Sequence, residues 1–238
     1  MGGKFYTAKH ILPIILKDRQ EGQWYVEPFC GGCNTLSEVT GNRIGADTHC
    51  ALIGMWLSVS YGWLPPESIS LDEYTHLKQS KDLPHVGSVN PLVGYVGFVM
   101  SFAGKYFGGY AKNNESNKDY AGQAAKSAQR QFPKLRNVIF KNCSYEDLKI
   151  PERSIIYCDP PYAGTTKYEG KRFDSLQFWE QVRNWVFDGH KVFVSEYRAP
   201  SDFVSIWSKE KKVVVKNTKD TQPLALEKLF VHRSQYNE

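Results

Sequence analysis

The segment SIIYCDPPYAGTTKY, residues 154–168, ends an apolar run abruptly in a carboxylate, two prolines and a tyrosine. Proline has no backbone N–H to donate to a strand ladder, and it disfavours helical geometry in the residue before it. A strand that begins near Ser154 must therefore stop at Asp159, and a short, stiff loop must follow. Loops at strand ends often carry ligand-binding and catalytic groups, so Asp159 and Tyr162 are candidates for chemistry.

Short apolar strands alternate with helical patterns along the chain, which indicates an α/β fold with a largely parallel sheet. Asp174 can cap a helix that Gly189 ends, because the apolar residues between them recur at helical spacing. Further helices are expected at 8–18, 48–60 and 120–136. The expected strands are 24–26, 43–46, 154–158 and 191–195, with 212–215 and 228–232 as an antiparallel edge.

The composition excludes a disordered chain and leaves several partner classes open. The 238 residues are 41% hydrophobic and 14% aromatic, and the formal charge of +5 permits nucleic-acid binding without demonstrating it. No apolar run approaches the roughly 20 residues of a membrane-spanning helix. Five scattered cysteines and no signal segment predict a soluble protein of a reducing compartment, the cytoplasm of a bacterial or phage-infected cell. We expect a monomer.

A second chemical segment is YVEPFCGGCNTLSEV, residues 25–39. We expect a strand that runs into Gly31 and Gly32 and then a helix, whose first amides could approach a ligand closely. The following strand ends in Asp47, 20 residues after Glu27. An acid at this spacing reaches ribose hydroxyls in nucleotide-binding folds, so an adenosine-containing cofactor is favoured. The glycine fingerprint of NAD-binding proteins is not present.

Taken in order, these segments resemble one enzyme family. GGK at 2–4, EPFCGG at 27–32, GAD at 45–47, a basic insertion and DPPY at 159–162 are similar to the Dam-type, D12 class adenine-N6 DNA methyltransferases, and to group alpha and phage-like members among them. SEYRAP at 195–200 and EKLFVH at 227–232 add to the resemblance. It implies a Rossmann-like S-adenosylmethionine-dependent methyltransferase fold. The catalytic domain would be 1–61 and 146–238, with an inserted target-recognition region at 62–145.

The resemblance also implies individual roles. Asp159 and the Pro160 carbonyl would accept the two hydrogens of the adenine amine and aim its lone pair at the methyl group, and Tyr162 would stack on the flipped base. Phe29 and Tyr168 are weaker candidates for walls of the same pocket. The implied catalytic set is Asp159, Pro160, Pro161 and Tyr162. The implied cofactor set is Lys4, Glu27, Pro28, Phe29, Gly31, Gly32, Asp47 and Asp159.

The insertion is more basic than the whole chain. Between residues 103 and 141 eight lysines and arginines face only Glu115 and Asp119. Such a run is as often a solvated surface as a nucleic-acid contact, but its position in the family's recognition slot favours double-stranded DNA. The insertion looks compact, with few structural elements, which suggests a short or relaxed recognition site that relies on phosphate contacts. The candidate DNA contacts are Lys105, Tyr110, Lys112, Asn113, Arg130 and Arg136.

Several alternatives stay open. Enzymes that methylate RNA, protein glutamine or cytosine N4 have motifs or chemistry related to DPPY. A non-catalytic DNA-binding or anti-restriction module would have lost part of DPPY, which is intact. Asp159 could simply start a turn, Asp47 could cap the next helix, and Lys4 could be a solvated terminal lysine. Cys30 and Cys33 form a C-x-x-C without a second pair at metal spacing, so no metal is predicted.

Overall fold

The computed structural model describes residues 4–81, 90–113, 118–161, 173–212 and 224–236. The chain forms two compact units, each described by itself: the first comprises Met1–Ala8 and Cys30–Leu148, and the second Lys9–Phe29 and Lys149–Glu238. Tyr162 and Tyr168 lie outside the described residues. The predicted division into 1–61 with 146–238 and an insertion at 62–145 stays a prediction.

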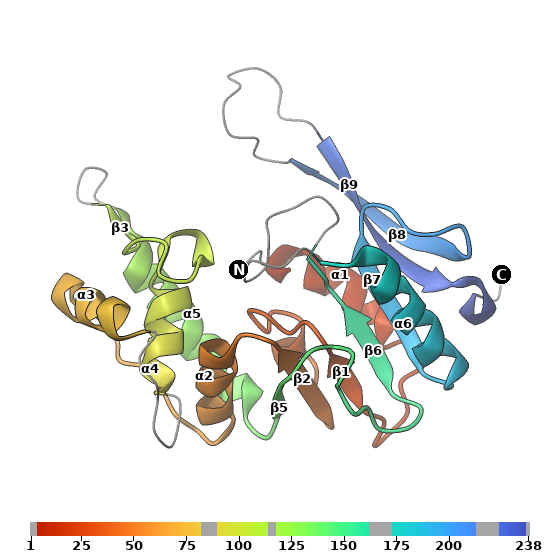
Figure 1. Ribbon diagram of the computed structural model, residues 1–238, viewed down its shortest axis with the longest axis horizontal. Coiled ribbons are helices and arrows are strands. Elements are labelled where there is room, and N and C mark those ends of the chain that lie inside the picture. Colours follow the sequence, from red (N-terminus) through yellow and green to blue (C-terminus); the bar gives the residue numbers. More distant parts are fainter. Residues whose placement is uncertain (1–3, 82–89, 114–117, 162–172, 213–223, 237–238) are drawn as a thin grey trace. The chain divides into compact units, whose positions relative to one another are not determined.

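A mixed seven-stranded sheet confirms the α/β prediction, and the second unit holds most of it (Figure 1). There β1 (Tyr25–Glu27), β6 (Ile155–Cys158) and β7 (Lys191–Glu196) run parallel. β9 (Leu224–His232) and β8 (Phe203–Lys212) continue the sheet antiparallel, as expected for the edge. Of the expected edge segment 212–215, Lys212 ends β8, and residues 213–215 lie outside the described residues.

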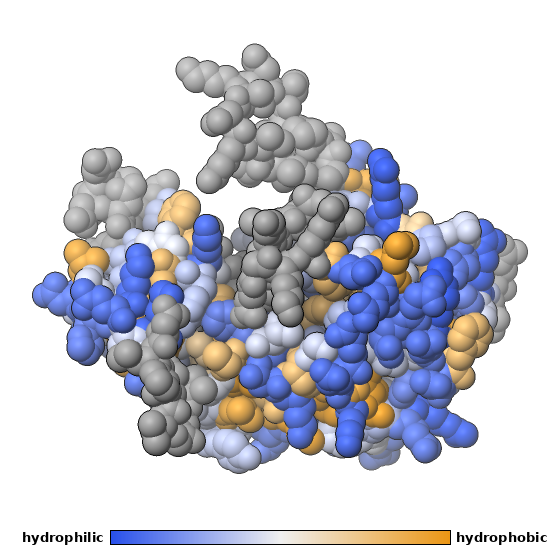
Figure 2. All heavy atoms as spheres, in the orientation of Figure 1, coloured by the Kyte–Doolittle hydropathy of each residue, from blue (hydrophilic) through white to orange (hydrophobic). Residues whose placement is uncertain are grey.

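The core of the second unit forms between this sheet and α6 (Ser175–Phe187), which begins and ends as predicted. Asp174 Oδ1 accepts hydrogen bonds from the amides of Leu176 and Gln177 at 3.0 and 3.1 Å. Gly189 adopts a left-handed φ of 86° just beyond the helix, a conformation that favours glycine. Phe178, Trp179, Val182 and Trp185 are buried. Hydrophilic side chains gather over the outer face of α6 (Figure 2).

The first unit contains the parallel pair β2 (Arg43–Asp47) and β5 (Ile139–Asn142), with α2 (Cys50–Ser60) packed on both. α5 (Tyr120–Gln131) and a following 3₁₀ turn (Phe132–Leu135) confirm the helix expected at 120–136. Helix α1 (Phe5–Ile15) begins earlier than the expected 8–18 and contains Pro13 without ending there.

The predicted insertion, residues 62–145, is richer in structure than expected, so the expectation of few elements was wrong. It contains α3 (Leu71–Ser80), α4 (Pro91–Gly94) with a continuing π turn (Tyr95–Val99), and the hairpin of β3 (Lys112–Asn113) and β4 (Lys118–Asp119). Helix α3 begins in a capping box made by Ser70 and Glu73. Its apolar periodicity is weak because Tyr74 is buried while Leu71 is exposed, so the sequence pattern did not predict the helix.

The helix expected after the glycines is also wrong, because only a 3₁₀ turn, Leu36–Glu38, forms there. Gly31 and Cys33 take positive φ values of 43° and 52°, so the chain turns instead of entering a helix. The β-branched Thr35, Val39 and Thr40 give little support to a longer one. In the part of the chain that the structure describes, no helix is long and apolar enough to cross a membrane.

Gly94 permits the close approach of α4 to α2. A Cβ at Gly94 would overlap the carbonyl oxygen of Ala51 and lie 2.8 Å from Met55 Cβ. We predict that Gly94→Ala lowers the free energy of unfolding by about 3 kcal/mol, because backbone atoms cannot step aside. Gly45→Ala is the comparison: the atoms nearest to its Cβ belong to the side chains of Leu36 and Phe140, and it should cost about 1 kcal/mol. Equal losses in urea unfolding would contradict this packing.

We expect the buried His190 to contribute to the loss of stability of the second unit at acidic pH. Burial lowers its pKa, against a smaller opposing effect of Asp188, and its Nδ1 accepts a hydrogen bond from the Ser154 amide at 3.1 Å. The unfolded chain therefore takes up this proton more readily, so stability falls as pH drops through the unfolded value of about 6.5. His190→Asn should lose less thermal stability than the wild type between about pH 7 and pH 5.5. Parallel melting curves over that interval would contradict the assignment.

Candidate active site

The glycine loop, defined here as residues 30–33, is fixed to the carboxyl end of β2. The Cys30 amide donates to the Ala46 carbonyl at 2.8 Å, and the Cys33 amide donates to the Cys30 carbonyl at 2.7 Å. A Cβ added at Gly31 would meet no atom within 4 Å. The loop is thus held from one side and leaves room for a ligand at Gly31.

Asp47 connects the loop to the end of the strand. Its Oδ2 accepts a hydrogen bond from the Gly31 amide at 3.2 Å, and its Oδ1 accepts one from the His49 amide at 3.0 Å. The reading of Asp47 as a helix cap is wrong, because His49 caps α2 and accepts from the Leu52 amide. A carboxylate has about four lone-pair sites, so these two bonds are compatible with acceptance from a ligand hydroxyl.

Two residues that the sequence reasoning missed hold the carbonyl side of the loop. Trp56 Nε1 on α2 donates to the Gly31 carbonyl at 2.9 Å, and Gln131 Nε2 at the end of α5 donates to the Gly32 carbonyl at 2.8 Å. Beside them lies a cavity of about 550 Å³ whose lining includes Gly32, Trp56 and Phe132. A tryptophan inside a helix is usually core, so the sequence carried no signal for this role.

The second unit contains the corner with which the sequence analysis began. Strand β6 ends at Cys158, as predicted; Asp159 is half-buried and Pro160 buried. Burial raises the pKa of the Cys158 thiol well above its usual value, and the carboxylates of Glu27 and Asp159 raise it further. The Cys158 thiol therefore stays protonated near neutral pH and is a poor nucleophile.

Glu27, at the end of β1, lies in the same unit as this corner. It is 3% exposed and accepts a hydrogen bond from the Tyr25 hydroxyl at 2.9 Å. Pro28 is buried, and the half-buried ring of Phe29 contacts Phe173 and Phe178 edge-on at centroid distances of 6.0 and 5.7 Å. Phe29 thus belongs to an aromatic cluster at the start of α6.

The basic candidates differ widely in exposure. Lys4 is only 5% exposed, which rules out the solvated terminal lysine, and its carbonyl accepts from Thr7 and Ala8 at the start of α1. Lys105 and Arg136 are exposed; Arg130 is exposed too, and its Nε donates to the Lys126 carbonyl at 3.1 Å. Lys112 and Asn113 form strand β3, and their side chains are outside the description.

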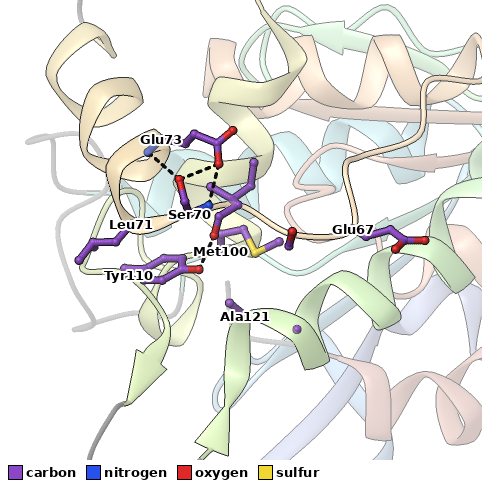
Figure 3. Close-up of a pocket in the computed structure, with 10 residues that line it drawn as sticks. Glu67, Ser70, Leu71, Glu73, Met100, Tyr110 and Ala121 are labelled. Atoms are coloured by element: carbon purple, nitrogen blue, oxygen red, sulfur yellow. Dashed lines mark hydrogen bonds between the residues drawn. The ribbon is translucent and has the colours of Figure 1, made fainter.

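Tyr110 lies on a cleft of about 680 Å³ within the first unit (Figure 3). Its hydroxyl donates to the Ile69 carbonyl. Acidic side chains, those of Glu67 and Glu73, line the same cleft, and Glu73 is engaged with Ser70 in the capping box. The Tyr110 hydroxyl therefore already has a partner within its unit.

Metal chemistry receives no support from the described ranges. No group of three or more His, Cys, Asp or Glu side chains in residues 4–81, 90–113, 118–161, 173–212 and 224–236 is placed to hold an ion. Cys30 and Cys33 are both buried.

A largely parallel sheet with acidic residues at the carboxyl ends of its strands and a glycine loop is the arrangement of Rossmann-like methyltransferases. The model of the D12 class N6 adenine-specific DNA methyltransferase family matches residues 96–222, more than half of the chain. The chain belongs to this family of DNA-modifying enzymes. The match includes the Asp159 corner. A search of the curated proteins finds no match.

The hydrogen bond from Trp56 to Gly31 should slow amide exchange in the glycine loop. Trp56→Phe keeps a ring in the aromatic cluster with Phe132 and Phe140 but removes the donor to Gly31. A hydrogen bond of about 1 kcal/mol predicts amide exchange at residues 31–33 faster by roughly fivefold to tenfold. Trp63→Phe, also in an aromatic cluster, is the matched control and should leave loop exchange unchanged. Unchanged exchange in Trp56→Phe would contradict the assigned anchor.

Proposed function

We propose that this protein transfers a methyl group from S-adenosylmethionine to the N6 amine of adenine in double-stranded DNA, and that it is a phage-like member of group alpha. The observation that carries the proposal is the Asp159-Pro160-Pro161 corner at the end of β6, inside the segment that matches the D12 family. The open side of Gly31 and the buried carboxylate of Asp47 support an adenosine-containing methyl donor.

The residues that the sequence assigns to the donor divide by role. Glu27, Pro28, Phe29, Gly31 and Gly32 would hold its methionine portion, and Asp47 would accept from the ribose hydroxyls. Lys4 would lie near the donor's carboxylate or the DNA, and Asp159 belongs to the set through its part in the reaction. S-adenosylmethionine supplies an already activated methyl group, so the protein needs no covalent nucleophile. The protonated Cys158 thiol agrees with that requirement.

In the proposed reaction the chain accepts hydrogen bonds from the adenine amine and orients that amine for methyl transfer. The lone pair of the adenine amine is delocalised into its ring, so the amine is a weak nucleophile. The Asp159 carboxylate and the Pro160 carbonyl accept its two hydrogens, favour a tetrahedral nitrogen and direct the lone pair along the line of transfer. Pro161 stiffens the corner, and Tyr162 stacks on the flipped adenine, a contact worth roughly 1 to 3 kcal/mol.

Recognition of DNA falls to the insertion at 62–145. The exposed side chains of Lys105, Arg130 and Arg136 are suited to phosphate contacts. Lys112 and Asn113, on the β3–β4 hairpin, are candidates for contacts with base edges. The hydroxyl of Tyr110 already bonds to Ile69, which makes its ring the part available for DNA.

The test is nucleoside mass spectrometry of unmethylated DNA treated with the protein and S-adenosylmethionine. We expect N6-methyladenine from the wild type and a loss of at least about a hundredfold in Asp159→Asn, because the variant keeps the size of the side chain but loses its charge. Asp188→Asn, an exposed carboxylate just after α6, is the matched control and should keep full activity. N4-methylcytosine as the product, or full activity in Asp159→Asn, would overturn the proposal.

A further inference from the structure

His49 stands directly between Asp47 and helix α2 in the first unit. Its amide donates to Asp47 Oδ1 at 3.0 Å, and its Nδ1 accepts from the Leu52 amide at 3.4 Å. Histidine is an unusual residue for this position, since Ser, Thr, Asp and Asn are the preferred N-caps. Capping therefore does not require an imidazole here, and the contacts of that ring call for a second explanation.

The imidazole ring of His49 packs against two aromatic rings from a later part of the chain. The ring centroids of Phe98 and Tyr106 lie 4.7 and 4.4 Å from its own, both edge-on, and 4.9 Å from each other. Aromatic pairs at such distances stabilise one another. We call these three residues the ring cluster. It joins the carboxyl end of β2, where Asp47 lies, to two segments that are distant in sequence.

Tyr106 belongs to a closed loop, residues 101–111, which also carries the candidate DNA contacts Lys105 and Tyr110. We call it the recognition loop. A bridge between Ser101 and Tyr110 joins its two ends, and a further backbone hydrogen bond of 2.7 Å crosses it. Because the loop is bonded within itself, a contact that positions its Tyr106 ring also positions the residues assigned to DNA.

The Tyr106 ring is also pressed against the π turn at Gly97. A Cβ added at Gly97 would overlap Cε2 of Tyr106 and lie 2.9 Å from Cε2 of Phe107. The Phe107 amide donates to the Gly97 carbonyl at 2.8 Å. The ring thus contacts both the π turn and His49, and of these two contacts only that with His49 leads directly to Asp47.

One cavity borders both the glycine loop and the recognition loop. The cavity of about 550 Å³ beside the glycine loop is lined by Gly32, by Phe98 of the ring cluster, and by Phe102 and Gly104 of the recognition loop. All of these residues belong to the first unit. The site assigned to the methyl donor and the loop assigned to DNA are therefore close neighbours, with the ring cluster between Asp47 and the loop.

We propose that His49 is a positioning residue that couples binding of the methyl donor at Asp47 to placement of the recognition loop on DNA. This inference rests on the proposed function. A ribose hydroxyl that donates to Asp47 fixes the carboxylate, and through it the backbone of His49. The ring of His49 then restrains Tyr106 and its loop. Since the first ligand orders what the second would otherwise have to order, each ligand strengthens binding of the other.

The test is a binding cycle with the full chain. Fluorescence anisotropy gives the affinity for a long, labelled, unmethylated DNA duplex with and without saturating S-adenosylhomocysteine, which occupies the donor site without turnover. In the wild type the ligand should tighten DNA binding on the order of tenfold. His49→Asn keeps a side chain that can cap α2 but removes the ring, so the ratio of the two affinities should fall below about twofold.

Two further variants separate the ring from the cap. His49→Phe keeps a ring and loses the cap, so it should melt at a lower temperature and yet keep most of the ratio. His76→Asn, at an exposed histidine on α3 of the same unit, is the matched control and should leave the ratio unchanged. If His49→Asn does not fold, Tyr106→Leu removes the same ring contact from the side of the loop and should lower the ratio equally.

The opposite results are equally clear. A ratio near one in the wild type, or the same ratio in the wild type and His49→Asn, would overturn the inference. A purely structural role would lower the melting temperature and weaken both ligands without changing the ratio, which would overturn it too, as would loss of the ratio in His49→Phe. A folded wild type that binds neither S-adenosylhomocysteine nor DNA would contradict the proposed function itself, and the inference with it.

Discussion

Two consecutive prolines after β6 are the constraint on which the site depends. Pro160 and Pro161 cannot donate to a ladder, so the strand stops at Cys158 and its next residue, Asp159, is held at the carboxyl edge of the sheet. Because β6 is bonded to β1 and β7 and is wholly buried, this stop is fixed by the core of the second unit. A carboxylate placed in this way loses little orientational freedom when it accepts a hydrogen bond from a substrate.

In the first unit, hydrogen bonds hold the candidate ligand-binding loop in place, whereas in the second unit two prolines restrict the segment at Asp159. The glycine loop is held by the Asp47 carboxylate on its amide side and by Trp56 and Gln131 on its carbonyl side. Glycine backbones are otherwise costly to order, because they lose more conformational entropy than any other residue. Anchors from β2, α2 and α5 offset that cost before any ligand binds, which is the physical meaning of a preorganised loop.

The sequence predicted those parts of the fold whose signals are local. The apolar run of β6 and the capped, periodic α6 needed no information from distant residues, and both were confirmed. The proline corner and Asp47 were likewise readable, because their neighbours in sequence define them. The helix expected after Gly32 failed because the positive φ of Cys33, unusual for a residue with a side chain, is imposed by the fold.

Other features depend on contacts between distant segments, and no local pattern could predict them. Gln131 reaches Gly32 across 99 residues, and Trp56 reaches Gly31 across 25. The sequence analysis did not predict helix α3 for a different reason. This helix is mostly exposed, so its apolar pattern is weak although its capping box is intact. Local sequence patterns therefore predicted candidate residues for the chemistry, while contacts between distant segments, such as that of Gln131 with Gly32, became visible only in the fold.

The central claim is that the glycine loop and Asp47 bind an adenosine-containing methyl donor. Equilibrium dialysis of labelled S-adenosylmethionine with the wild type and with Asp47→Asn tests it most directly. The account predicts saturable binding at one site by the wild type, weakened at least about tenfold in Asp47→Asn, because the amide cannot replace both acceptor oxygens. Absence of binding by the folded wild type, or equal binding by the two proteins, would contradict it.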